Sequence, residues 1–454
     1  MGTARLLDDS PITAFHVKAC CYTVGGFICD GYILGSIGLA LPQIKTEMGL
    51  GSTWEGLLGA SALIGIFAGS VVFGPITDRV GRKKMLLGDL VLFVIASVLQ
   101  LFVAGPVALF ALRFLLGVAI GADYAIAPTL LTEFAPRRYR GRLLSSLNAT
   151  FTVGFVASYG IGILLDGRLG DDAWRWLLAS SAIPGLLTLL LRLGTPESPR
   201  WLVSKGRADE ARSIVDRYFG PEYALEEAPP KEQRTRYREV FSRRYRGRTF
   251  FAGMFWLCQV FPYFGIGTFL PRIVDAFGIE NGSLGEVLFN LLLLAGAVAG
   301  WFVMDAISRR SFVIWSFVIV GSALLVLGLD PSLPAPVLIP VFLVVAFVIS
   351  AAADLESVYP SEIFPTEVRA SGTGLAAGIS RVGAALSTFV LPSVLDGLGI
   401  GPTMLILAAV VFLGVVISVP LAPETRHVAL HEASREAQPE DRGAEAQPAA
   451  TARG

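Results

Sequence analysis

Charged residues are scarce in this sequence. Asp, Glu, Lys and Arg together make up 16% of its 454 residues, whereas soluble domains contain about a quarter. Acidic and basic residues number 37 each, so the formal net charge is +0 and a nucleic-acid partner is not indicated. Hydrophobic residues reach 53%, and the mean hydropathy is +0.62. We therefore expect a protein that is solvated mostly by the lipid bilayer.

Residues that hold metals or perform catalysis are also few. The three histidines form no cluster with cysteine, so a metal site is not indicated. The glycine-rich Walker loop ending in Lys-Ser/Thr does not occur, so nucleotide hydrolysis is not expected to drive this protein. The sequence contains no nucleophile–base pair of the kind that catalyses reactions in enzymes. We therefore expect neither an enzyme nor a cofactor. We interpret the cysteines as small apolar helix residues rather than disulfide partners. They are Cys20, Cys21, Cys29 and Cys258.

Twelve apolar runs follow one another along the chain, each long enough to cross a bilayer. A spanning helix needs roughly 20 mostly apolar residues. The predicted spans are 19–41, 55–75, 86–105, 107–130, 143–165, 174–194, 249–270, 285–305, 312–330, 335–358, 372–395 and 402–421. The pattern predicts an all-α integral membrane protein with twelve transmembrane helices.

The sequence also repeats itself, with a shift of 227 to 229 residues. The repeated groups are Asp78–Arg82–Lys83 with Asp305–Arg309–Arg310, Glu133–Pro136–Arg140 with Glu362–Pro365–Arg369, Pro196–Glu197–Ser198 with Pro423–Glu424–Thr425, and Pro42 with Pro271. Pro42 closes predicted span one, and Pro271 closes predicted span seven. We therefore expect two six-helix halves in the same orientation, with a solute site between them near the membrane midplane. The predicted divisions are 1–200, the N-terminal half; 201–248, a polar and basic central loop; 249–426, the C-terminal half; and 427–454, a disordered tail.

Basic residues predict the orientation of the spans, because cytoplasmic loops are enriched in Lys and Arg. The loops after the even-numbered spans contain Arg79, Arg82, Lys83, Lys84, Arg137, Arg138, Arg140, Arg142, Arg309, Arg310 and Arg369, together with the basic 200–248 segment. The loops on the other side contain only Lys45, Arg168 and Arg272. We expect the even-numbered spans to end in the cytoplasm and both termini to be cytoplasmic.

The loop after span two has the sequence Gly74-Pro-Ile-Thr-Asp78-Arg79-Val-Gly81-Arg82-Lys83. It resembles the signature loop of the major facilitator superfamily of transporters. The resemblance implies a latch that stabilises the outward-facing state, with Asp78 pairing with a helix N-terminus or an arginine. In the second copy, Trp301 stands where Gly74 predicts glycine and Ser308 replaces Gly81, which implies a weaker latch.

Further motifs at the helix ends resemble the sugar-porter and organic-ion branches of this superfamily. They are Arg113-x3-Gly117-x3-Gly121, Glu133 with Arg140, Pro196-Glu-Ser-Pro-Arg200-Trp201, Glu362 with Arg369, and Pro423-Glu-Thr-Arg426. The glycine spacing places both glycines on one helix face, where a neighbouring helix can pack closely. The residues assigned to the latch are Gly74, Asp78, Arg79, Gly81, Arg82, Asp305, Arg309, Arg113, Glu133, Arg140, Glu197, Arg200, Glu362 and Arg369. Plain membrane anchoring is the alternative for the charged ones.

The choice of branch depends on three positions. Sugar porters carry a Trp where Ser357 stands, and paired glutamines in span seven where only Gln259 follows Cys258. Both departures count against a hexose. Gly378-Ile-Ser-Arg381-Val-Gly383 in span eleven resembles the organic-ion branch, whose anion carriers hold an arginine there. Span five lacks the proline of drug exporters, which counts against export.

Ionisable residues inside a membrane are costly and therefore tend to be functional. Asp30 in span one is the first candidate for carrying a proton, because burial disfavours the charged form of a carboxyl group. Asp123 in span four is the second candidate, unless it caps a bend near Pro128. For the solute we select Arg381, Gln259, Asn148 and Glu356. Two alternatives remain open: Arg381 as a permanent ion pair with an acid, and Asn148 as helix–helix hydrogen-bond glue.

These features together predict a secondary active transporter that moves a small organic anion with protons by alternating access. Its expected partners are the solute, protons and the lipid bilayer, and we expect a monomer in the cytoplasmic membrane. The alternatives are a sugar or polyol symporter, a proton-coupled drug exporter and, in a different class, a non-transporting membrane sensor.

Overall fold

The computed structural model describes residues 5–6, 11, 13–134, 140–221, 223–224, 237–278, 282–304, 306–364 and 368–425. Helices make up nearly all of this part of the chain. They are α1 (Ala14–Met48), α2 (Ser52–Val80), α3 (Arg82–Leu99), α4 (Pro106–Phe134), α5 (Arg140–Leu169), α6 (Ala173–Ser180), α7 (Ala182–Arg192), α8 (Pro199–Ser204), α9 (Ala208–Tyr218), α10 (Arg246–Thr268), α11 (Leu270–Ala276), α12 (Gly282–Val303), α13 (Arg309–Leu329), α14 (Ala335–Ala353), α15 (Leu355–Ile363), α16 (Arg369–Leu398) and α17 (Ile400–Leu421). Two short strands, β1 (Arg5–Leu6) and β2 (Tyr223–Ala224), pair in parallel.

The described residues contain eleven apolar segments that are long enough to cross a membrane. One of them, Ser146–Arg192, consists of α5 followed by α6 and α7 after a turn at Gly170, so it makes two crossings. The prediction of twelve transmembrane helices is therefore confirmed. Three of the crossings are built from two helices each: α6 with α7, α10 with α11, and α14 with α15.

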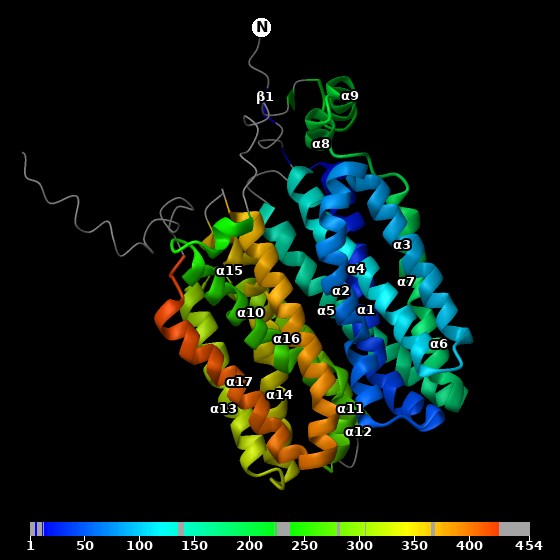
Figure 1. Cartoon of the computed structure of the whole chain (residues 1–454), viewed down its shortest axis with the longest axis vertical. Helices are drawn as coiled ribbons and strands as arrows, with labels where there is room; N and C mark the ends of the chain where they lie inside the picture. Colours follow the sequence, from blue (N-terminus) through cyan, green and yellow to red (C-terminus); the bar gives the residue numbers. More distant parts are fainter. Residues whose placement is uncertain are drawn as a thin grey trace, which may run out of the picture.

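The helices form two six-span bundles that follow the sequence repeat. Figure 1 shows α1 to α7 on one side and α10 to α17 on the other. The bundles meet along two seams, where α2 packs on α16 and α5 packs on α12. Tyr159 of α5 also donates a hydrogen bond to the Gly267 carbonyl of α10 at 2.7 Å. The space between the halves is thus bounded by helices from both repeats.

The connection between the halves lies at one end of the bundle, which we call the α8–α9 end (Figure 1). The central segment 201–248 is not simply a loop, because it contains α9, most of α8 and a short 3-10 helix at Tyr237–Phe241. The first turn of α9 contains Asp209 and Glu210 and the last contains Arg217, as the helix dipole favours. The predicted tail, 427–454, lies outside the described residues.

The two repeated prolines differ in position: Pro42 does not end its helix, contrary to our expectation, whereas Pro271 follows the end of α10. Pro42 lies inside α1, which continues to Met48, and Pro271 lies in the first turn of α11. A proline in the first turn costs no hydrogen bond, because the amide there has no partner in the helix. Inside a membrane helix, neighbouring groups can compensate for the backbone bond that proline removes.

Close packing of α2 against α4 explains the glycine motif. A Cβ atom added at Gly117 would lie 2.0 Å from the Ala62 carbonyl oxygen, and one at Gly121 would lie 2.3 Å from that of Ile66. Both contacts are with backbone atoms, which cannot rotate away. The expectation that these glycines permit a close helix approach is confirmed.

We expect Gly117→Ala to lower the midpoint of thermal unfolding of the purified protein by several degrees. Overpacking costs about 1–3 kcal/mol, which exceeds the helix-propensity gain of about 1 kcal/mol for Gly→Ala. The matched control is Gly160→Ala in α5, where an added Cβ atom meets no atom within 4 Å. Equal midpoints for the two variants would show that the helix approach is not tight.

Candidate functional site

A cluster of buried charges lies inside the N-terminal half. Arg192, near the end of α7, is 1% exposed. Its Nη1 atom lies 2.8 Å from Asp123 Oδ1, and its Nη2 atom donates to Asp123 Oδ2 at 3.0 Å. Asp89 of α3 is more distant, with Oδ1 at 3.8 Å from Nη1. Arg192 also donates to the carbonyl oxygens of Tyr22 and Leu86. This guanidinium therefore joins four transmembrane segments.

Asp30 completes the cluster from α1. Its side chain is 2% exposed, and within the described part of the chain its Oδ2 atom has no hydrogen-bond partner. Asp30, Asp89 and Asp123 line one small cavity together with Gly26 and neighbouring apolar residues. A Cβ atom at Gly26 would lie 1.9 Å from Asp123 Oδ2. The glycine thus leaves room for the carboxylate beside α1.

The structure brings together the two residues that the sequence selected for proton coupling, and adds two that the sequence analysis missed. Arg192 lies close to the end of predicted span 174–194, and Asp89 lies close to the start of predicted span 86–105. Charged residues are common at span ends, so neither was selected as a functional candidate. The sequence did contain a signal for both residues, because a charged residue inside a predicted apolar run is a candidate functional residue. We name Asp30, Asp89, Asp123 and Arg192 the buried charge cluster.

Arg381 of α16 lies between the two halves. Its guanidinium carbon is 5.2 Å from the centre of the Tyr124 ring on α4 and 5.8 Å from that of Phe264 on α10. In the described part of the chain no acid forms an ion pair with Arg381, so the permanent interhelical pair is not observed. Aromatic faces stabilise a guanidinium but leave its five N–H donors available for an anion.

The other three candidate solute ligands are engaged with protein groups. Gln259 donates to the Ile349 carbonyl at 2.7 Å, within the C-terminal half. Glu356 accepts a hydrogen bond from Trp256 Nε1 at 2.7 Å. Asn148 of α5 donates to the Ala353 carbonyl of α14 at 3.1 Å, so it joins the two halves. This last contact fits the hydrogen-bond glue alternative, and solute binding by these three residues stays a prediction.

The motif loop of the N-terminal half is held by an acid that follows span six. Glu197 Oε1 accepts hydrogen bonds from the backbone amides of Arg82 at 3.0 Å and Lys83 at 3.3 Å. These amides belong to the N-terminus of α3, where a negative charge is favourable. Gly81 has φ of 109°, a conformation that favours glycine. Glu197 therefore fixes the loop to its own half.

The C-terminal half repeats this arrangement. Ser308 caps α13 by accepting from the Ser311 amide at 3.2 Å, and it also donates to Glu424. Arg309 Nε lies 3.5 Å from Glu362 Oε2, and Arg309 Nη1 donates a hydrogen bond to the Met304 carbonyl oxygen at 2.6 Å. Ser308 and Glu424 correspond to Gly81 and Glu197 by the repeat. The repeated motifs thus make contacts at corresponding positions, through backbone amides in one half and a serine hydroxyl in the other, although their role as a latch stays a prediction.

Arg113 lies apart from these helix-end residues, and its role in the latch stays a prediction. It is fully buried inside the bundle, and its Nη2 atom donates to the Ile33 carbonyl of α1 at 3.3 Å. Arg113 lies two turns into α4, far from the α8–α9 end. Arg79 is exposed on the last turn of α2. Asp305 lies outside the described residues, as do the side chains at positions 78, 133, 140, 200 and 369, and the burial of Gly74 is not described either.

Comparisons with known proteins agree on one family. A family model for the sugar (and other) transporters matches residues 18–437. The inner membrane metabolite transport protein YgcS of Escherichia coli is 41% identical over 424 residues, which cover 93% of this chain and 95% of the relative. The D-xylose transporter of Levilactobacillus brevis is 30% identical over 396 residues, covering 83% of this chain and 86% of the relative.

The fold matches solved structures of the xylose transporter XylE from E. coli. A partially occluded inward-open form has a TM-score of 0.77 at 20% identity and covers 92% of this chain and 100% of that one. A second structure shows XylE, described as a major facilitator superfamily proton:xylose symporter, bound to 6-bromo-6-deoxy-D-glucose. It has a TM-score of 0.73 at 21% identity and covers 93% of this chain and 99% of that one. The family resemblance drawn from the motifs is confirmed. This chain belongs to the sugar (and other) transporter family of the major facilitator superfamily, whose members are membrane transporters of sugars and other metabolites rather than enzymes.

Proposed function

We propose that this protein is a proton symporter for a small organic anion, with the α8–α9 end facing the cytoplasm. The observation that carries the choice of anion is Arg381, a guanidinium at the boundary of the halves that forms no ion pair with an acid among the described residues. A buried positive charge without a counter-ion is costly in a membrane. A solute carboxylate would compensate it, with charge-assisted and bidentate hydrogen bonds.

The proton site of the proposal is the buried charge cluster. Three carboxyl groups face one guanidinium there, so full ionisation would leave an excess of negative charge in the low-dielectric interior. Resident protons on the carboxyl groups relieve this excess. Each of the three acids has a buried oxygen without a hydrogen-bond partner among the described residues, but only Asp89 and Asp123 lie within ion-pair distance of Arg192. We therefore assign the exchangeable proton to Asp30 and assign Asp123 to the ion pair with Arg192.

The two sites are near enough to influence each other. The Tyr124 ring, which lies 5.2 Å from the Arg381 guanidinium carbon, belongs to the residue that directly follows Asp123 in α4. An anion bound to Arg381 would cancel the positive field of that residue at Asp30. Solute binding would then favour proton binding, and proton binding would favour solute binding by the same factor. This reciprocity is what symport requires.

A sugar is the second candidate solute. The L. brevis relative is named a D-xylose transporter and is 30% identical to this chain. Sugars are bound by neutral hydrogen-bonding groups together with aromatic faces. Such groups are present on Gln259, Asn148 and Tyr124. In this structure Gln259 is hydrogen-bonded to the Ile349 carbonyl and Asn148 to the Ala353 carbonyl.

Uptake into proteoliposomes under an imposed pH gradient, alkaline inside, tests the proposal. Labelled organic acids and sugars are screened, and Arg381→Gln is measured beside the exposed control Arg168→Gln. We expect one organic acid to accumulate, with uptake reduced about tenfold or more in Arg381→Gln by the loss of a charge-assisted bond. Accumulation of a sugar alone, unaffected by Arg381→Gln, would establish the second candidate instead. No accumulation of any solute would refute symport.

A further inference from the structure

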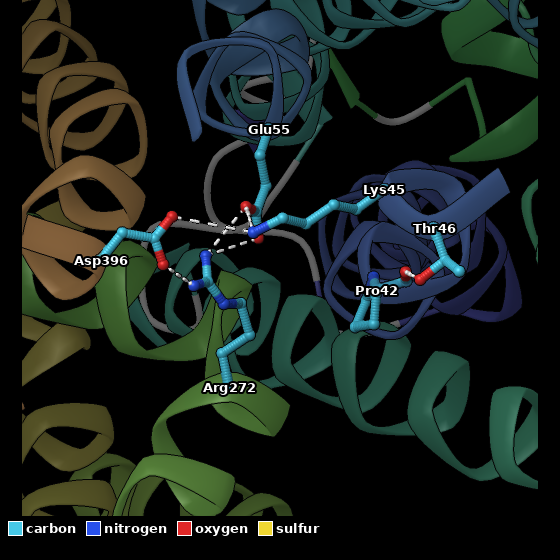
Figure 2. A network of polar contacts seen from close by, with 6 residues as sticks. All are labelled: Pro42, Lys45, Thr46, Glu55, Arg272 and Asp396. Atoms are coloured by element: carbon cyan, nitrogen blue, oxygen red, sulfur yellow. Dashed lines mark hydrogen bonds and ion pairs between the residues drawn. The ribbon is translucent and has the colours of Figure 1, made fainter. Parts of the chain in front are cut away.

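Four charged residues join the two halves at the end of the bundle opposite α8 and α9. Lys45 of α1 and Glu55 of α2 come from the N-terminal half, and Arg272 of α11 and Asp396 of α16 come from the C-terminal half. Figure 2 shows the four side chains converging, with Lys45 and Arg272 directed at Glu55. We name these residues the four-charge network.

Glu55 is the centre of the network. Arg272 Nη1 donates to both carboxylate oxygens of Glu55 at 2.8 Å, and Lys45 Nζ lies 2.9 Å from Oε2. Arg272 Nη2 also donates to Asp396, and Lys45 Nζ lies 3.7 Å from Asp396 Oδ2. The Glu55 side chain is 0% exposed, whereas that of Asp396 is 42% exposed. The buried acid therefore needs its partners more than the exposed one does.

The network contains two kinds of contact. Lys45–Glu55 and Arg272–Asp396 lie within one half each, whereas Arg272–Glu55 and Lys45–Asp396 cross between the halves. Each half contributes one acid and one base. If the halves separate at this end, only the crossing contacts must break, and each half retains a neutral ion pair. Separation therefore leaves no charge without a partner.

This division of contacts has an energetic consequence. Removing one partner from a buried ion pair leaves an uncompensated charge, which is strongly destabilising. A single crossing pair would incur such a cost each time the halves separated. In the four-charge network, Lys45 stays with Glu55, so the cost of separation is limited to the hydrogen bonds from Arg272 and the weak Lys45–Asp396 contact.

We propose that the four-charge network is a reversible gate, which Arg272 closes on Glu55 and which opens by exchanging crossing pairs for pairs within each half. The inference rests on the proposed alternating access, in which this end must open once in each cycle. Lys45 and Arg272 carry the same charge and both contact Glu55, yet the proposal gives them different roles. Arg272 holds the gate closed, whereas Lys45 allows it to open.

Distances between spin labels on the full-length protein in lipid nanodiscs test the gate without any solute. Labels are placed at Leu169→Cys and Leu329→Cys, which are exposed positions at this end in different halves. The background has Cys20 and Cys21 replaced by Ser, while the buried Cys29 and Cys258 are retained. Arg272→Gln and Lys45→Gln are then compared with the unchanged network.

We expect Arg272→Gln to raise about tenfold the ratio of molecules with a long distance between the two spin labels (open) to molecules with a short distance (closed). The reason is that the variant removes the charge-assisted hydrogen bonds to Glu55, which exist only in the closed form. Lys45→Gln should leave that ratio unchanged or lower it, since Glu55 keeps Arg272 when closed but loses its own partner when open. Glu55→Gln, alone or with Arg272→Gln, should match Arg272→Gln, because both remove the same crossing contact.

Equal lengthening by Arg272→Gln and Lys45→Gln would overturn the proposal, since it would show simple attraction between the halves. No response to Arg272→Gln in a folded protein would overturn it as well. The result is separable from the proposed function: a gate that responds as expected in a protein without proton-driven uptake refutes symport alone, whereas a network without response in an active symporter refutes the gate alone.

Discussion

Asp30→Asn is expected to abolish proton-driven accumulation of the solute while leaving its equilibration across the bilayer intact. Asparagine has the shape of a protonated aspartate but cannot release a proton. The variant should therefore cycle as a permanently protonated form. A symporter that moves one proton with each solute can accumulate it roughly tenfold per pH unit, because one unit corresponds to about 1.36 kcal/mol. The accumulation ratio of the variant should fall to about one.

The measurement for Asp30→Asn uses the same proteoliposomes in two modes. Uptake under the pH gradient reports uphill transport, and counterflow without a gradient reports equilibration. The matched control is Asp171→Asn, which alters an exposed acid in the turn between α5 and α6 and should behave as the unchanged protein. If Asp30→Asn still accumulates the solute, the coupling proton resides elsewhere, and Asp89 becomes the next residue to replace.

Arg192→Gln is expected to be strongly destabilising. It removes the only cation in contact with Asp123 and Asp89 among the described residues, and both acids are buried. Breaking a buried pair by removing one partner costs about 3–5 kcal/mol. We expect a large loss of folded protein and a lower midpoint of thermal unfolding. Arg168→Gln, at an exposed position, should leave both unchanged.

A double variant distinguishes the loss of the ion pair from the loss of packing. Adding Asp123→Asn to Arg192→Gln removes the partner charge as well, and replacing both members of a buried pair costs less than removing one. The double variant should therefore recover part of the stability lost in Arg192→Gln. Should the double variant instead be less stable by the sum of both single effects, Arg192 would contribute by packing and by its bonds to the Tyr22 and Leu86 carbonyls.

The sequence was sufficient for the architecture, because the relevant signals are local and repeated. A run of about 20 apolar residues must form a helix in lipid, where backbone groups can bond only within the chain. The shift of 227 residues then related the two halves, and the structure shows contacts at corresponding positions: Glu197 accepts from the α3 amides and Glu424 accepts from the Ser308 hydroxyl. The glycine spacing in α4 also predicted the close approach of a neighbouring helix, which the structure identifies as α2.

The limits of the sequence appear where function depends on the direction in which a side chain points. An apolar run predicts a helix but not its rotation, so Arg192 could not be recognised as the partner of Asp123. The four-charge network is a stronger case. Glu55 and Arg272 are separated by 217 positions, and each appears in the sequence as an ordinary charge near a span end.

Helix formation, the repeat and the membrane location therefore follow from the order of residues, since each depends on neighbours within about 20 positions or on a repeated motif. The pairing of charges depends on how the helices rotate and pack, a property of the whole bundle. The buried charge cluster and the four-charge network exist because packing places acids and bases from different helices where solvent cannot compensate them.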